Sequence, residues 1–118
     1  MKRQRNFSLS SRSRAYLATL SEVSGCTIPM FLVMIINWAT TAQEPFSKFD
    51  RDASRDDLTA ASFESELISR FDNLYKLYEI ESRSKALDFA IESFRQQGID
   101  KTGIFGDPDR IHQALKSS

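Results

Sequence analysis

The side chains of this sequence that could do chemistry are concentrated near its beginning. Residues 1–40 carry five cations against the single carboxylate of Glu22, a net charge of +4, whereas the remaining residues carry eleven cations and fifteen carboxylates, a net charge of −4. The cations of the first segment are Lys2, Arg3, Arg5, Arg12 and Arg14. Cationic groups beside short polar side chains are suited to attract phosphate. A solvated tail that keeps the chain soluble is the alternative interpretation.

Catalysis and metal binding have little support in the composition. The 118 residues include one cysteine, Cys26, and one histidine, His112, far apart in the chain. A single thiol and a single imidazole complete neither a disulfide framework nor a zinc site. Asp50 begins a run with oxygen ligands at alternate positions, as in a calcium-binding loop, but Arg55 replaces its glycine and Ala61 its bidentate glutamate. We therefore predict no enzymatic activity, no cofactor and no metal.

The sequence predicts a soluble, cytoplasmic protein without a membrane partner. The basic start is followed by polar residues where a secretory signal would need an apolar core. The longest apolar stretch, residues 28–39, is about half as long as a segment that crosses a bilayer. An apolar content of 41% and a charged content of 27% are ordinary for a globular domain.

The first half of the chain is predicted to begin with a strand. Polar and apolar residues alternate over residues 5–10, which is the period of a half-buried strand. Its apolar face would place Phe7 and Leu9 in the core. The opposite, outward face would present Gln4, Asn6 and Ser8.

Two helices are predicted to follow this strand. A helical pattern begins at Ser11 and is broken at Gly25, a residue typical of helix ends. Thr27 is the expected N-cap of a second helix, which runs from Pro29 to about Ala42. Almost every face of this second helix is apolar, so we expect it to be buried on several sides.

The second half of the chain repeats the order of these elements. A strand is predicted over residues 58–63, a helix over residues 64–78, and a further helix capped by Ser82 that ends before Gly98. The halves superimpose at an offset of 54 residues through the first helices and 55 residues through the second. This superposition aligns Ser8 with Ser62, Ser11 with Ser65, Leu20 with Leu74, Leu32 with Leu87 and Ile36 with Ile91. The shared order and apolar spacing indicate an internal duplication.

The chain is therefore predicted to contain four segments. Residues 1–42 form the first unit with its basic arm, and residues 58–97 form the second unit. A charged linker, residues 43–57, joins them, and residues 98–118 form a C-terminal tail.

Strand, helix, tight turn and helix in this order resemble the ribbon-helix-helix family of DNA-binding proteins, the Arc and MetJ type. The most specific match is SRSKALDFAIESF, residues 82–94, which is similar to the second helix of the family. FESELI, residues 63–68, resembles the family's strand-to-helix junction, with Glu64 where proline is common. The first half matches in layout but departs at residues 28–29, Ile-Pro, where the family usually has a polar residue followed by serine.

This resemblance covers roughly residues 4–42 and 58–97 and implies a mostly α fold of two tandem copies. Family members dimerise through a two-stranded antiparallel ribbon that enters the DNA major groove. A single unit of about forty residues buries too little surface to fold alone. We therefore expect residues 5–9 to pair with residues 59–63 inside one chain, giving a monomeric pseudo-dimer or a higher assembly on DNA.

The resemblance implies a sequence-specific protein for double-stranded DNA, either a transcriptional repressor or an accessory factor of plasmid transfer. The base-contacting residues would be Gln4, Asn6, Ser8 and Ser62. The phosphate-contacting residues would be Lys2, Arg3, Arg5, Arg12, Thr27, Ser82 and Arg83. Thr27 and Ser82 also fit the role of simple helix caps, and Arg83 that of a solvated charge.

A protein-interaction module on the same scaffold, such as an antitoxin-like partner-binding protein, is the alternative function. The neutral total charge, the acidic second half and the small side chains of the second strand favour it. A protein partner would then dock on the linker or on the C-terminal tail.

Overall fold

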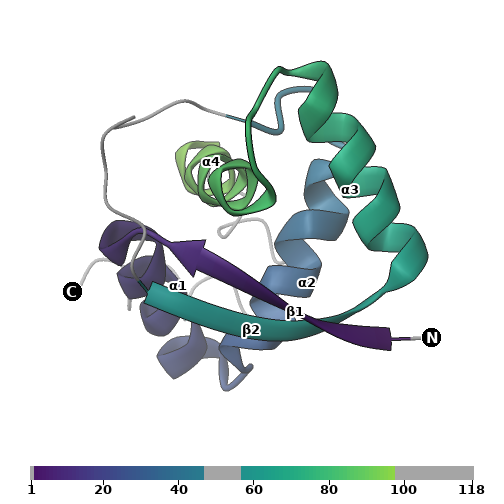
Figure 1. Ribbon diagram of the computed structural model, residues 1–118. Coiled ribbons are helices and arrows are strands. Elements are labelled where there is room, and N and C mark those ends of the chain that lie inside the picture. Colours follow the sequence, from purple (N-terminus) through teal and green to yellow (C-terminus); the bar gives the residue numbers. More distant parts are fainter. Residues whose placement is uncertain (1, 47–56, 98–118) are drawn as a thin grey trace.

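In the part of the chain that the structure describes, six elements form two strand–helix–helix units (Figure 1). The computed structural model describes residues 2–46 and 57–97, so the predictions for most of the linker and for the tail lie outside the described residues. The elements of the first unit are β1 (Lys2–Leu9), α1 (Ser11–Ser24) and α2 (Ile28–Ala39), and those of the second are β2 (Asp57–Glu64), α3 (Ser65–Leu77) and α4 (Arg83–Gln96). The predicted mostly α fold with one two-stranded antiparallel ribbon is confirmed.

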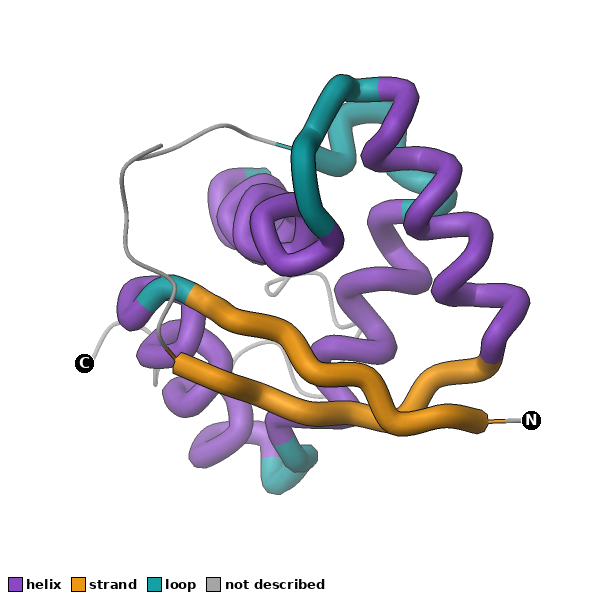
Figure 2. Tube along the Cα trace, viewed as in Figure 1, coloured by secondary structure: helices purple, strands orange, loops and turns teal. Residues whose placement is uncertain are grey.

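The ribbon is formed by β1 and β2, which lead into α1 and α3 at its opposite ends (Figure 2). Residues 5–9 of β1 pair with residues 57–61 of β2, so the predicted strands pair, but with a register two residues earlier than 59–63. A shift by two residues leaves every side chain on its predicted face, because the side-chain period of a strand is two. Phe7 and Phe63 accordingly meet in the core, with ring centroids 5.5 Å apart in an edge-to-face contact.

α2 and α4 begin at the predicted hydroxyl caps. Thr27 Oγ1 accepts a hydrogen bond from Met30 N at 3.4 Å, and Ser82 Oγ accepts one from Lys85 N at 3.1 Å. Each bond satisfies a backbone donor that the first helical turn leaves without a partner. α2 ends at Ala39 rather than near Ala42, since the hydroxyls of Thr40 and Thr41 donate to backbone carbonyls of the last turn.

Gly25 ends α1 in the left-handed conformation, with φ 76° and its N–H bonded to the Ser21 carbonyl. No neighbouring atom lies within 4 Å of the Cβ that another residue would add here, so a side chain meets only backbone strain. Gly25→Ala is therefore expected to lower the free energy of unfolding by about 1–2 kcal/mol. Urea denaturation measures this loss, and Gly25→Asn should lose less because asparagine tolerates the conformation better. Equal losses for the two variants would contradict the explanation.

α4 is buried over a longer continuous run of residues than α2. α4 packs against β1 and against all three other helices, and its residues Ala86–Phe94 are buried without interruption. The prediction that α2 is buried on several sides is confirmed, since α2 packs against β2, α1, α3 and α4, while Met30, 51% exposed, and Asn37 face the solvent. The position of a helix among its neighbours, and not its mean apolarity, decides which faces are covered.

Candidate nucleic-acid interface

The outward face of the ribbon brings together the four predicted base-contacting residues. Gln4 lies opposite Ser62 in the register, and Asn6 and Ser8 follow at alternate positions of β1. Gln4, Asn6 and Ser62 are exposed, and Ser8 is half-buried. These side chains carry both donors and acceptors on a face opposite to the one that packs on the core.

Two further residues on this face were not among the predicted site residues. Leu58, opposite Ser8, is 69% exposed, and Glu64 stands opposite Lys2 at the other end of the ribbon. The period-two alternation of β2 places both outward, so this was the signal in the sequence that could have found them. The face therefore combines a polar centre with an apolar end at Leu58 and with an end where Glu64 stands opposite Lys2.

The predicted phosphate-contacting cations differ in their exposure and in their contacts with other residues. Arg3 is exposed, and it lies opposite Phe63, so it belongs to the ribbon face of Phe7 and not to the outward face. Arg5 belongs to the same face and is half-buried, with its Nε lacking a hydrogen-bond partner among residues 2–46 and 57–97. Arg12 is exposed but is already paired with a carboxylate of the chain, since its Nη2 donates to Glu92 Oε1 at 3.0 Å. Lys2 begins β1.

The remaining predicted phosphate contacts lie at the starts of α2 and α4, where the hydroxyls of Thr27 and Ser82 serve as caps. Arg83 is held by the Asp72 carboxylate in a two-point contact, with Nε–Oδ1 at 2.8 Å and Nη2–Oδ2 at 2.6 Å. Such a planar two-point geometry is the strong form of an arginine–carboxylate pair. Arg83 would have to leave Asp72 to bind a phosphate with the same nitrogens.

The Arg83–Asp72 pair affects the pH dependence of stability. Burial raises the pKa of Asp72, but the hydrogen bonds and the charge of Arg83 outweigh it and leave the pKa below its ordinary value of 3.8. A carboxyl whose pKa is lowered by folding adds stability above its unfolded-state pKa, and this stability is lost as the pH falls through the folded-state value.

Asp72→Asn is therefore expected to destabilise the protein at pH 6–7, by about 1 kcal/mol or less because the pair is partly exposed. The difference from the native protein should shrink as the pH falls below 3.8. Urea unfolding at several pH values between 7 and about 2.5 measures both curves. Curves that stay parallel over this range would contradict the assignment.

The arrangement defines a class of fold, namely two β-α-α units whose strands pair antiparallel, a topology compatible with a tandem ribbon-helix-helix protein. A scan against protein-family models finds no match to the chain, and searches of curated proteins and of solved structures find none either. In the part of the chain that the structure describes, no helix is long and apolar enough to cross a membrane. Within the same ranges, no three side chains from histidine, cysteine, aspartate or glutamate gather as a metal site would require.

Proposed function

We propose that this protein is a tandem ribbon-helix-helix protein that binds double-stranded DNA sequence-specifically, as a transcriptional repressor or an accessory factor of plasmid transfer. The observation that carries the proposal is the outward face of the ribbon, where Gln4, Asn6 and Ser62 are exposed. A two-stranded ribbon fits the major groove, and side-chain amides can bond to adenine through two hydrogen bonds at once. Ser8 adds a hydroxyl on the same face.

Attraction to the phosphates supports the same proposal. The exposed guanidinium of Arg3 lies near the end of the ribbon that Lys2 begins, in the part of the chain that carries a net charge of +4. Phosphate contacts of this kind orient a protein on the duplex, while contacts to the base edges select the sequence. In this protein, Arg3 would contact phosphates, and the polar outward face of the ribbon would contact the base edges.

Selection from a random duplex library followed by binding measurements tests the proposal most directly. We expect a preferred sequence that binds about 1,000-fold or more tightly than random duplex. The purified chain should retain weaker binding to any duplex at low salt. Absence of duplex binding at low salt would rule the proposal out.

Asn6 lies at the centre of the ribbon, directly opposite Ala60, so it has room to reach a base edge. Asn6→Ala is expected to weaken binding to the selected sequence by about 5–150-fold, the value of one two-point base contact. Binding to random duplex should change little. Fluorescence anisotropy with both duplexes measures the two effects, and Asn73→Ala, an exposed asparagine of α3, is the matched control.

A protein-interaction module remains the second candidate function, because specific contacts favour it. Leu58 is 69% exposed on the outward face of the ribbon, and carboxylates of the chain itself hold Arg12 and Arg83. Affinity capture with the full chain tests this candidate. A stoichiometric protein partner that persists after nuclease treatment would support it, and recovery of nucleic acid alone would count against it.

A further inference from the structure

The second unit contacts the first through a row of polar residues on α4, which we call the polar seam. Its members lie four residues apart on one side of the helix, and each binds the β1–α1 junction of the first unit. Ser84 Oγ accepts a hydrogen bond from Ser8 N at 2.9 Å, Asp88 Oδ1 accepts one from Ser10 N at 3.2 Å, and Glu92 Oε1 accepts one from Arg12 Nη2 at 3.0 Å.

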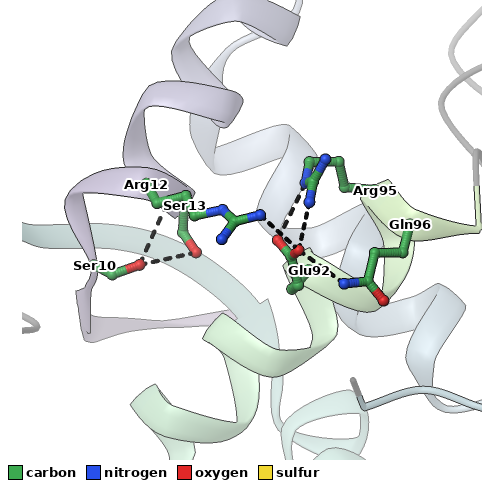
Figure 3. A network of polar contacts seen from close by, with 6 residues as sticks. All are labelled: Ser10, Arg12, Ser13, Glu92, Arg95 and Gln96. Carbon is green, nitrogen blue, oxygen red and sulfur yellow. Dashed lines mark hydrogen bonds and ion pairs between the residues drawn. The ribbon is translucent and has the colours of Figure 1, made fainter. Parts of the chain in front are cut away.

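The carboxylate of Glu92 is the most elaborate part of the polar seam (Figure 3). Its side chain is only 4% exposed, and it also accepts hydrogen bonds from Arg95 Nε at 3.1 Å and Gln96 Nε2 at 3.0 Å. Burial raises the pKa of Glu92, but Arg95, Gln96 and Arg12 lower it below its ordinary value of 4.5. The group therefore stays ionised at neutral pH although it is buried between the units.

The two units can be compared position by position, because their caps and buried residues coincide. The N-caps Ser10 and Glu64 differ by 54 residues, and the N-caps Thr27 and Ser82 differ by 55. At the latter offset the buried residues of α2 fall on buried residues of α4, as in Leu32 with Leu87.

These offsets show that α2, the equivalent of α4 in the first unit, carries no row of residues like the polar seam. The α2 residues equivalent to Ser84, Asp88 and Glu92 are Pro29, Val33 and Asn37. The residues of β2 and α3 equivalent to their partners Ser8, Ser10 and Arg12 are Ser62, Glu64 and Glu66. Carboxylates thus stand on α4 and on the β2–α3 junction, and neither on α2 nor on the β1–α1 junction.

We propose that the polar seam selects the partner of the second unit: α4 accepts the β1–α1 junction of a first unit and rejects the β2–α3 junction of another second unit. If two second units paired with the same geometry, Glu64 would take the place of Ser10 beside Asp88, and Glu66 the place of Arg12 beside Glu92, once on each side. Asp88 and Glu92 are buried, so a second carboxylate brought against either of them is repelled. Two first units would pair without repulsion, but Val33 offers no acceptor to the N–H of Ser10.

The consequence is a ribbon that always combines one β1 with one β2, whether the two strands come from one chain or from two exchanged copies. This selection is independent of the proposed binding of DNA. Because β1 and β2 present different side chains outward, every assembly of the protein has an asymmetric ribbon face.

Cysteine cross-linking tests the selection at the centre of the ribbon. Asn6 pairs with Ala60, and these two residues are also equivalent at the offset of 54. In a pair of second units, Ala60 would therefore face Ala60 of the other copy, and opposed strand residues lie within reach of a disulfide. Ala60→Cys in a Cys26→Ser background reports such a pair as a covalent dimer.

The linker must be cleaved for this test, since it keeps the two units of one chain at a high effective concentration. A protease site is placed within residues 47–56 of the full chain, the folded protein is cleaved, and the two pieces are equilibrated in a glutathione redox buffer. Non-reducing electrophoresis then measures covalent dimers of the second unit. With the native polar seam we expect almost none.

Glu64→Ser with Glu66→Arg gives the second unit the junction residues of the first, and should raise the covalent dimer at least about tenfold. Asp88→Asn with Glu92→Gln removes the charges on α4 instead, and should also raise the amount of covalent dimer. The control, Glu79→Ser with Glu81→Arg, makes the same charge change in the α3–α4 turn. Asn6→Cys with Ala60→Cys must link the two pieces in every background, which shows that they still pair.

The proposal is overturned if the second unit with its native residues forms as much covalent dimer as the two variants do. It is equally overturned if neither the junction variant nor the α4 variant forms more dimer than the control while the link between residues 6 and 60 still forms.

Discussion

Phe7→Ala is expected to lower the free energy of unfolding by about 3–5 kcal/mol, the largest loss that we predict for a single substitution. Phe7 is fully buried and packs edge-to-face on Phe63 of the partner strand, so its removal opens a cavity where the two units meet. Domains of this size are stable by only about 5–15 kcal/mol, so the variant should be close to unfolding. Urea denaturation followed by circular dichroism measures the loss.

The matched control for Phe7→Ala is Leu58→Ala, on the same ribbon but on its outward face. Leu58 is 69% exposed, so its truncation should change the free energy of unfolding by about 0.5 kcal/mol or less. Similar losses for the two variants would contradict the assignment of one ribbon face to the core and the other to the solvent.

The affinity for duplex DNA is expected to fall by roughly 100-fold when the salt concentration rises from about 50 to 200 mM, if about four cations each neutralise one phosphate. Each neutralised phosphate releases condensed counterions, so the logarithm of the affinity falls linearly with the logarithm of the salt concentration. Arg3→Ala removes an exposed guanidinium next to Gln4 in β1, and should reduce the slope of this line by about one. Fluorescence anisotropy titrations at several salt concentrations measure the slope.

Arg70→Ala is the control for this measurement, since Arg70 is an exposed arginine of α3. Its slope should equal that of the native protein. A binding affinity that does not depend on salt, or equal slopes for Arg3→Ala and the native protein, would argue against phosphate contacts by the amino-terminal segment.

The order of the elements, the caps of α2 and α4 and the two faces of the ribbon could be predicted from the sequence. Each of these depends on residues close together in the chain: the alternation around Phe7, the glycine at the end of α1, and the hydroxyls of Thr27 and Ser82. The match between the two halves, together with the resemblance to a family of dimers, was enough to predict that β1 pairs with β2. Local patterns determine such features because strands and helices repeat every two and 3.6 residues.

The tertiary structure alone decided how the two units recognise each other. Nothing in the pattern of α4 distinguishes Asp88 and Glu92 from exposed residues, and both are buried because partners about 80 positions earlier in the chain bind them. The same kind of contact occupies Arg12, which the resemblance to the family had assigned to phosphate. A buried charge depends on its partner in space, and the spacing of residues along one helix carries no information about a partner on another element.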